Sequence, residues 1–417
     1  MELALLGGRP VRKEPFPSWP VYGKEEEKAL QDVLRSRTWG GYSPHVEEFE
    51  QALARLHGVR HAITCCNGSV ALEVALRTLD LECGDEVIVP PITFVSTATS
   101  VMICHGVPVF ADIDAGTLNL SPAAVEASIT PRTRAIIAVH FGGHPADVDA
   151  LRAIALRHQL ALIEDAAHAH GAAWRGVPVG NFGSAATFSF QAFKLATAGE
   201  GGAVLTNSST LAEKVWSYCN LGRHKGAGWF EHFSVGSNYR LTGFQAAVLS
   251  AQLKRLPEQS QTRSENVRYF REQMRPIRGL CLAEDDSRVS NHPHYILTLR
   301  YDPEAFGGVD RDLFLRALQA EGIPAQPTYP YPLYRNPLFR KESLPPCGCG
   351  KWKASQNYES LLLPESERVC KDGMWLEHYL FLGTHQEVDD IIAAFEKVQQ
   401  GANSLLQHQM SPEASRP

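Results

Sequence analysis

The chain carries the segment Phe188-Ser189-Phe190-Gln191-Ala192-Phe193-Lys194, and Gly199-Glu200-Gly201-Gly202 follows it closely. The apolar and aromatic run before the lysine predicts a short buried strand and a turn. The glycines let the backbone approach a ligand tightly. Upstream, residues 160–163 form another apolar run, which continues into Glu164 and Asp165. Both segments therefore predict strands of an α/β sheet with polar side chains at its edge.

Further apolar runs alternate with helical patterns between about residues 60 and 205. Leu72 and Leu76 repeat at helical spacing, and residues 147–157 predict a helix before the run at 160–163. Strands separated by helices of this length indicate an α/β fold, with a mostly parallel sheet covered by helices on both faces. The predicted strands are residues 61–65, 86–89, 107–111, 135–139, 160–163, 186–190 and 203–206.

The pattern changes after residue 240, where two helices are expected, at residues 244–251 and 256–274. They predict a connection from the large domain to a smaller C-terminal domain of helices and strands. Within that domain, residues 310–321 predict a helix, and the Pro/Tyr-rich stretch 323–337 predicts a loop. The predicted division is an N-terminal arm at 1–30, a large cofactor-binding domain at 31–254, a small domain at 255–400 and a flexible tail at 401–417.

Length and charge exclude several classes of protein. The 417 residues suffice for two domains and a large core, and the net charge is −6. Without a basic stretch, the chain has little to neutralise nucleic-acid phosphates. No apolar run approaches the roughly 20 residues of a membrane span, and the N-terminus lacks the pattern of a secretory signal. We therefore expect a cytoplasmic protein with no nucleic-acid and no membrane partner.

The nine cysteines are irregularly spaced, which is more typical of reduced thiols than of a disulfide framework. Cys347 and Cys349 resemble half of a zinc site, but no second Cys/His pair stands at the required spacing. His168 and His170 are also poorly spaced for two ligands on one helix face. The sequence therefore predicts no metal site.

Lys194 and Asp165 together indicate the chemistry of pyridoxal phosphate (PLP). A lysine amine can form a Schiff base with the cofactor aldehyde, and a carboxylate can keep the pyridine nitrogen protonated, so that the ring accepts electrons. Ligands of open α/β sheets bind at the carboxyl edge of the strands, where Asp165 is expected. Taken singly, Asp165 could be a helix N-cap and Lys194 a surface lysine. Their combination with the glycine-rich segment favours the cofactor.

A site for the cofactor phosphate is predicted at Asn67-Gly68-Ser69, which follows the first strand and begins a helix. The first amides of a helix are unpaired, and the helix dipole favours an anion there. Gly68 lets the backbone approach, and Ser69 adds a hydroxyl, although the same residues also form an ordinary helix cap. The chain lacks G-x-x-x-x-G-K-[ST] and a G-x-G-x-x-G between strand and helix, which argues against ATP and dinucleotide sites.

Two further side chains are expected at the same edge of the sheet. Phe94 follows the strand at 86–89, where its ring could stack on the pyridine or fill the core. His168 stands three residues after Asp165, and we expect it to form a hydrogen bond instead of binding a metal. The aromatic ring of Phe94 and the imidazole of His168 would then both lie next to the cofactor.

In combination, these segments resemble the DegT/StrS-type (DegT/DnrJ/StrS) sugar aminotransferases, which are PLP-dependent enzymes of fold type I. The likeness extends over nearly the whole chain. Its motifs are Pro17-Ser18-Trp19-Pro20, Trp39-Gly40-Gly41, Asn67-Gly68-Ser69-Val70-Ala71-Leu72, Pro91-Ile92-Thr93-Phe94, Glu164-Asp165-Ala166-Ala167-His168-Ala169-His170-Gly171, Ser189-Phe190-Gln191-Ala192-Phe193-Lys194, Gly199-Glu200-Gly201-Gly202 and Gly236-Ser237-Asn238-Tyr239-Arg240-Leu241.

The resemblance implies a catalytic centre and a phosphate site. Lys194 would be the Schiff-base lysine, and Asp165 would be the partner of the pyridine nitrogen. Gly68, Ser69 and Ser189 would hold the phosphate.

The resemblance also implies a homodimer with the site at its interface. Phe94 would stack on the cofactor ring, and His168 would stand near the ring hydroxyl, where most members have glutamine. In this family a loop of the second subunit completes the phosphate site. Asn238 matches that loop and Arg240 lies nearby, although both could also belong to a solvated turn.

Lysine at position 194 favours amino transfer, because relatives that perform dehydration carry histidine there. The implied reaction moves an amino group from glutamine or glutamate to a keto-sugar or keto-cyclitol, with pyridoxamine phosphate as intermediate. Residues 327–339 and 375–378 are most similar to the branch of keto-inositol aminotransferases and 3-amino-5-hydroxybenzoate synthases. The candidate substrate contacts are Arg240, Tyr329, Tyr331 and Tyr334.

Other functions remain open at this point. The chain could be a PLP-binding regulator or sensor without turnover, or a dehydratase and aromatase like 3-amino-5-hydroxybenzoate synthase. An α/β oxidoreductase is a further interpretation, but its phosphate fingerprint is missing. The acceptor ketone is not predicted, because its recognition depends on the shape of loops.

Overall fold

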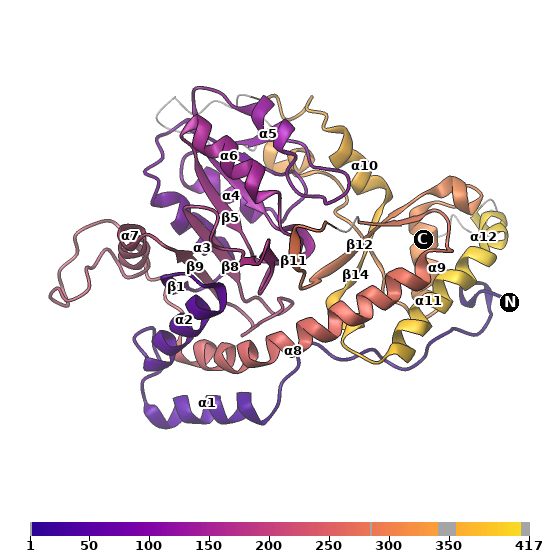
Figure 1. The fold of residues 1–417 in the computed structure, drawn as a ribbon, viewed down its shortest axis with the longest axis horizontal. Helices are drawn as coiled ribbons and strands as arrows, with labels where there is room; N and C mark the ends of the chain where they lie inside the picture. Colours follow the sequence, from indigo (N-terminus) through magenta and orange to yellow (C-terminus); the bar gives the residue numbers. More distant parts are fainter. Residues whose placement is uncertain (1, 284–285, 341–355, 410–417) are drawn as a thin grey trace.

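The computed structural model describes residues 2–283, 286–340 and 356–409. A large layered α/β domain and a smaller group of strands and helices lie side by side, and the long helix α8 (Gly243–Met274) runs along both (Figure 1). This architecture confirms the predicted α/β fold with a smaller C-terminal domain. Cys347 and Cys349 lie outside the described residues.

Seven strands form the large sheet. Five neighbouring strands are parallel, and only β9 runs against its neighbours β8 and β1. The carboxyl ends of β1, β2, β5 and β8 therefore lie at one edge of the sheet, and β1 and β2 have the predicted bounds. In spatial order the strands are β1 (His61–Cys65), β9 (Gly202–Thr206), β8 (Ala185–Ser189), β5 (Ala161–Asp165), β4 (Thr133–Val139), β2 (Glu86–Val89) and β3 (Val107–Phe110).

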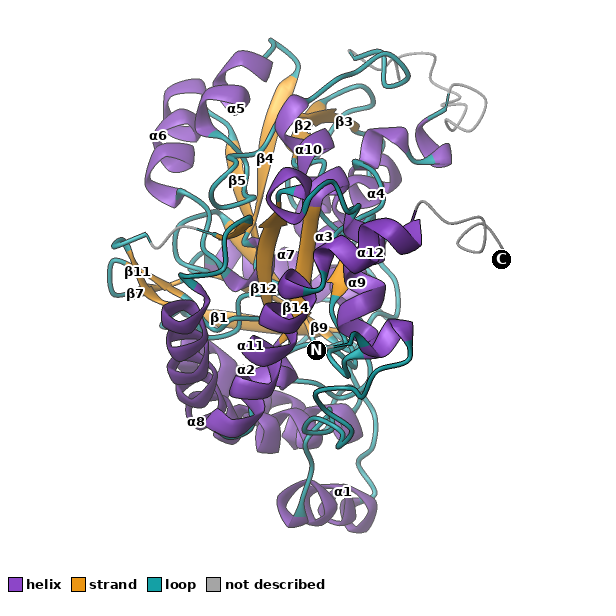
Figure 2. Cartoon of the chain, turned by 90° about the vertical axis from the view of Figure 1, so that its right-hand side faces the viewer, coloured by secondary structure: helices purple, strands orange, loops and turns teal. Residues whose placement is uncertain are grey.

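The large sheet is buried on both faces because side chains alternate along each strand. In β4, Ile136 packs into one apolar cluster and Ile137 into another on the opposite face. Figure 2 shows α5 and α6 on one side of the sheet and α3 and α4 on the other. The covering helices are α3 (Gly68–Arg77), α4 (Ser96–Ile103), α5 (Pro122–Ser128), α6 (Val148–His158) and α7 (Ser209–Cys219).

The small domain has its own antiparallel sheet and core. Phe314 and Phe395 are fully buried between the sheet and its helices. The sheet follows the order β10 (Leu280–Leu282), β12 (Ile296–Tyr301), β14 (Gly373–Glu377) and β13 (Gln326–Pro327), and the helices are α9 (Arg311–Ala320) and α11 (His385–Gln400). A third sheet consists of β11 (Val289–Asn291), β6 (Ala173–Trp174) and β7 (Val177–Pro178), and α10 (Pro364–Asp372) precedes β14.

Helix α8 is one continuous helix, so the predicted pair of helices is wrong. It contains Pro257, which lacks an amide donor and costs about 3 kcal/mol in a helix interior. Leu256 packs into the core of the large domain, whereas Phe270 packs into the core of the small domain. Burial on both sides of the proline outweighs its local cost. The predicted boundary between residues 254 and 255 consequently falls inside a helix that belongs to both cores.

The two ends of the chain meet the small domain. Leu3 and Leu405 both lie in its apolar core. Helix α12 (Ala402–Gln409) contains Leu405, so the predicted flexible tail is wrong over residues 402–409, and residues 410–417 lie outside the described part. Two helices of the N-terminal part, α1 (Lys24–Ser36) and α2 (Pro44–His57), pack on α8.

One cysteine departs from the expectation of reduced thiols. Among the described cysteines, Cys83 is disulfide-bonded, whereas Cys65, Cys66, Cys104, Cys219, Cys281 and Cys370 are free thiols. Spacing could not predict this bond, because it depends on which loops meet in space. In the part of the chain that the structure describes, none of the helices has both the length and the apolar character required to cross a membrane.

Candidate active site

Lys194 lies in a turn after β8, at the carboxyl edge of the large sheet. Its amide donates to the carbonyl of Gln191 over 2.8 Å, and the amide of Phe193 donates to Oε1 of Gln191 over 3.0 Å. These bonds close the lysine turn (residues 191–194). The amine is thus presented from a fixed piece of backbone.

Two residues from distant segments hold the carbonyls of the lysine turn. Nε1 of Trp19 donates to the carbonyl of Ala192 over 3.0 Å, and Nε2 of His378 donates to the carbonyl of Phe193 over 3.1 Å. The rings of Trp19 and His378 also meet edge to face, with 4.4 Å between their centroids. The N-terminal arm and the small domain therefore fix the turn together.

The amine of Lys194 lies against an aromatic hydroxyl. Its Nζ donates to the hydroxyl of Tyr295 over 3.3 Å and lies 4.5 Å from the centre of the Tyr295 ring. Burial lowers the pKa of Lys194 to about 8, although the negative charges of Asp165 and Glu377 act in the opposite direction. A substantial fraction of the amine is consequently neutral near pH 8, as a base or nucleophile must be.

Asp165 is the last residue of β5 and is buried at the sheet edge. Its Oδ2 accepts a hydrogen bond from the hydroxyl of Thr97 over 3.1 Å, and its Oδ1 accepts one from the amide of Ala167 over 3.2 Å. Burial raises the pKa of Asp165, while these two bonds and the charge of Lys194 oppose the rise. Strand β5 lies beside β8, and the ring of His168, three residues after Asp165, stacks on Tyr295, which accepts from Nζ of Lys194. Asp165 and Lys194 therefore belong to one site.

His168 lies flat against Tyr295. Their ring centroids are 4.3 Å apart with 27° between the planes, and Nδ1 of His168 accepts from the amide of Gly142 over 3.4 Å. Burial, together with the charge of Lys194, lowers the pKa of His168 well below its usual value. His168 is thus a neutral ring whose Nδ1 is an acceptor. Among the described residues, no three His, Cys, Asp or Glu side chains form a group that could hold a metal ion.

The predicted phosphate cradle lies where α3 begins. Oδ1 of Asn67 accepts from the amide of Val70 over 2.9 Å and caps the helix. A Cβ added to Gly68 would stand 2.6 Å from Cβ of Ser189, so only glycine leaves this approach open. Ser69 is exposed, and its hydroxyl lies 2.5 Å from the hydroxyl of Ser96 at the start of α4. Sequence reasoning did not predict Ser96.

Phe94 follows β2 and leaves 61% of its surface exposed. An exposed aromatic ring at the ligand-binding edge of the sheet has a free face on which a planar ring can stack. The alternative, that Phe94 fills the core, does not agree with this exposure.

The three candidate tyrosines have different surroundings. Tyr329 is partly buried beside Phe141 and Trp375, and burial together with the charge of Asp165 raises the pKa of its hydroxyl. Tyr331 is partly exposed. The structure does not bring Tyr334 to the lysine: its ring lies in the core, and its hydroxyl donates to Glu367 over 2.6 Å.

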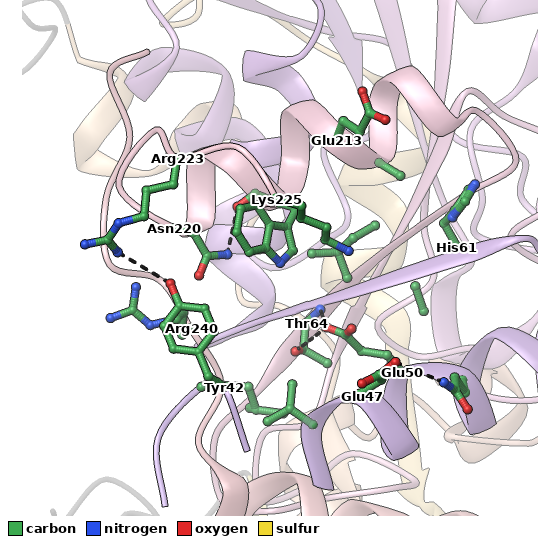
Figure 3. Close-up of a pocket in the computed structure, with 18 of the residues that line it drawn as sticks. Tyr42, Glu47, Glu50, His61, Thr64, Glu213, Asn220, Arg223, Lys225 and Arg240 are labelled. Atoms are coloured by element: carbon green, nitrogen blue, oxygen red, sulfur yellow. Dashed lines mark hydrogen bonds between the residues drawn. The ribbon is translucent and has the colours of Figure 1, made fainter. Parts of the chain in front are cut away.

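Arg240 lies in a different place, a pocket of about 780 Å³ whose lining includes neither Lys194 nor Asp165. Figure 3 shows Arg240 beside Tyr42, whose hydroxyl accepts from Nη1 of Arg223 over 3.4 Å. Nη1 of Arg240 is buried without a hydrogen-bond partner among the described residues. Asn238 is exposed two residues earlier. This pocket is therefore separate from the lysine site within one chain.

The residues at the carboxyl edge fit PLP. Lys194 supplies an amine of lowered pKa, Asp165 a buried carboxylate, and Gly68 with Ser189 a narrow opening at a helix N-terminus. Sequence reasoning missed Tyr295, which comes from the small domain and gave no local signal.

Comparison with known proteins agrees with this site. The DegT/DnrJ/EryC1/StrS aminotransferase family matches residues 20–396. A Streptoalloteichus tenebrarius protein with the provisional name L-glutamine:3-amino-2,3-dideoxy-scyllo-inosose aminotransferase is 40% identical over 97% of this chain and 99% of its own length. The L-glutamine:2-deoxy-scyllo-inosose aminotransferase of Streptomyces lividus is 38% identical, over 95% of this chain and 97% of its own.

The fold is similar to solved structures of the same kind. 3-Amino-5-hydroxybenzoic acid synthase superposes with a TM-score of 0.83 at 34% identity, over 92% of this chain and 98% of that one. DesV of S. venezuelae gives a TM-score of 0.78 at 32% identity, over 91% and 94% of the two chains.

Proposed function

This chain belongs to the DegT/DnrJ/EryC1/StrS aminotransferase family, and we propose that it uses PLP to transfer an amino group from glutamine or glutamate to the ring ketone of a keto-cyclitol. The observation that carries the proposal is the buried pair of Lys194 and Asp165 beside the opening at Gly68. The names of the Streptoalloteichus tenebrarius and Streptomyces lividus relatives support a keto-cyclitol acceptor. A role in aminocyclitol antibiotic biosynthesis is part of the proposal.

Each residue of the site has a task that its surroundings explain. PLP, when bound, supplies a ring that accepts electrons from the substrate carbon. Asp165 would hold a proton on the ring nitrogen, since a buried carboxylate favours a cation beside it. Gly68, Ser69 and Ser189 would bind the phosphate, and Phe94 and His168 would hold the ring from its sides.

Lys194 would move the proton. With a pKa of about 8, its Nζ is neutral often enough to take a proton from the α-carbon of the donor and later to deliver one to the acceptor carbon. Tyr295 keeps this Nζ in place through its hydroxyl. Trp19 and His378 prevent the turn beneath it from shifting.

We further propose that two copies of the chain form the working unit. Trp229, Phe230, Phe233 and Val235 are exposed in the segment before Asn238, which is unusual for a free surface. The unpaired Nη1 of Arg240 lies in the pocket next to this segment. A second copy would cover the aromatic side chains and could receive Asn238 at its phosphate site. A cytoplasmic location, expected from the sequence, remains part of the proposal.

The test separates the two half-reactions. PLP-loaded protein is mixed with glutamine or glutamate, and conversion of the cofactor to its pyridoxamine form is followed by absorbance. A panel of keto-cyclitols and nucleotide-linked keto-sugars is then added, and products are identified by mass spectrometry.

The products distinguish the proposal from its alternatives. An unchanged spectrum with both donors would support a regulator or sensor and contradict an aminotransferase. A product that has lost water and become aromatic would support the dehydratase and aromatase. Gain of an amino group by a keto-cyclitol is the expected result.

A further inference from the structure

Glu377 is a carboxylate of the site to which the proposed reaction gives no task. It is the last residue of β14, opposite Ile296 of β12. Met374 and Leu376 point into the core of the small domain, whereas Trp375 packs against the large-domain cluster. Because side chains alternate along a strand, Glu377 lies on the same face as Trp375. It therefore faces the large domain and the lysine turn.

Glu377 stands beside the lysine turn, because the next residue, His378, donates from Nε2 to the carbonyl of Phe193 over 3.1 Å. This placement agrees with the opposing effects of the two charges on the pKa values of Glu377 and Lys194. Burial raises the pKa of Glu377, and the charge of Lys194 opposes the rise. Within residues 2–283, 286–340 and 356–409, however, no hydrogen bond or ion pair joins Glu377 to another side chain. A partly buried carboxylate without such a partner favours a ligand that brings a cation or strong donors.

Lys194 cannot serve as this partner throughout the reaction, because it must become neutral to accept a proton. The α-carboxylate of an amino acid donor would be repelled by Glu377. A ring ketone that already carries an amine would instead place an ammonium group in the site.

We propose that Glu377 binds an ammonium group on the acceptor, so that the site prefers keto-cyclitols that already carry one amine over those that carry only hydroxyls. The inference rests on the proposed function and narrows its substrate class. The provisional name of the Streptoalloteichus tenebrarius relative specifies an acceptor of this kind, a keto-cyclitol with an amine at position 3.

The experiment compares two acceptors that differ in one group. Wild type, Glu377→Gln and the control Glu396→Gln, an exposed glutamate of α11, are assayed with a keto-cyclitol bearing an amine and with its hydroxyl analogue. Wild type and the control should prefer the amine by roughly 10- to 100-fold in kcat/KM, as expected for a hydrogen bond to a charged group. Glu377→Gln should reduce this preference to within about threefold. It should not slow the donor half-reaction, because loss of the charge removes a repulsion from the donor carboxylate.

A binding measurement adds a readout that needs no turnover. Calorimetry uses protein loaded with pyridoxamine phosphate, to which an added amine cannot form a Schiff base. 1-Amino-1-deoxy-scyllo-inositol and scyllo-inositol, neither of which has a ketone, should show the same preference in wild type and its loss in Glu377→Gln. Equal binding of both compounds to wild type would overturn the inference, as would a Glu377→Gln variant that slows the donor half-reaction as much as the acceptor half-reaction. Failure of glutamine and glutamate to convert the cofactor in wild type would instead overturn the proposed function.

Discussion

The lysine site and the aromatic segment before Asn238 are opposite kinds of surface. Around Lys194, the rings of His168, Tyr295 and His378 are buried and contact one another. In the aromatic segment (residues 229–235), Phe230 and Val235 expose 86% and 88% of their surface. One region is closed by side chains of a single chain, and the other lacks a cover. The comparison teaches that one chain surrounds Lys194 with its own side chains, whereas its aromatic segment is left exposed and is where the proposed second copy would bind.

The largest effect is expected at the closed region. Lys194→Ala removes the amine that bonds to the cofactor and carries the proton, so turnover should fall by roughly five orders of magnitude or more. Rates are measured for both half-reactions. An exposed lysine of α10, changed as Lys371→Ala, is the control. Near-normal rates in Lys194→Ala would remove the lysine from the mechanism.

A smaller loss of activity is expected when only the negative charge of Asp165 is removed. Asp165→Asn keeps the shape that Thr97 and Ala167 hold, but it no longer favours a proton on the ring nitrogen. We expect kcat to fall about 10²- to 10³-fold, the range for loss of one charge-stabilising group. Asp149→Asn at the surface should leave kcat unchanged. If Asp165→Asn retained the wild-type kcat, the role of the carboxylate would be refuted.

A substitution in the aromatic segment should weaken dimer formation more than it lowers the catalytic rate. Phe230→Asp places a charge where a second copy is expected, and the dimer should weaken about 30-fold, as for loss of a contact worth about 2 kcal/mol. Light scattering coupled to size exclusion measures the mass at several concentrations. Leu156→Asp, at a side chain of α6 that is 71% exposed, is the matched control. A Phe230→Asp protein that dimerises like the control would show that this segment is not the interface.

The smallest effect on the rate is expected when the hydroxyl of Tyr295, which holds the amine of Lys194, is removed. Tyr295→Phe removes the oxygen that accepts from Nζ of Lys194, and this oxygen stabilises the charged amine. The pKa of Lys194 should therefore fall below about 8, and the rise of kcat/KM with pH should occur at lower pH. The rate at the optimum should fall about two- to tenfold.

Tyr301→Phe, whose hydroxyl donates to Val309 inside the small domain, is the control for the pH profile. An unchanged profile in Tyr295→Phe would assign the hydroxyl a structural role only.

The strands of the large domain could be predicted because each is an uninterrupted apolar run between helices. Asp165 and Lys194 could be placed at the carboxyl edge for the same reason, since parallel strands end together. Both predictions depend on residues close together in the sequence. They required no knowledge of how the domains meet.

The remaining features depend on contacts between distant segments. Tyr295 and Glu377 reach Lys194 from the small domain, and no local pattern shows which residues of a strand face another domain. The helical patterns at 244–251 and 256–274 predicted two helices, but burial against two cores preserves α8 as one helix through Pro257. Tyr334 stood in a motif shared with relatives, yet it is buried and bonded to Glu367. In each case tertiary packing outweighed the local signal.

The double anchoring of the lysine turn has a consequence for the order of events during synthesis. Trp19 precedes the large sheet in the chain, whereas His378 follows it. The large sheet can assemble before the segment with His378 has been synthesised, but the lysine turn receives its second support only after that segment emerges. A product that ends before His378 could thus have most of the scaffold and still lack a competent centre, which delays activity until the small domain is present.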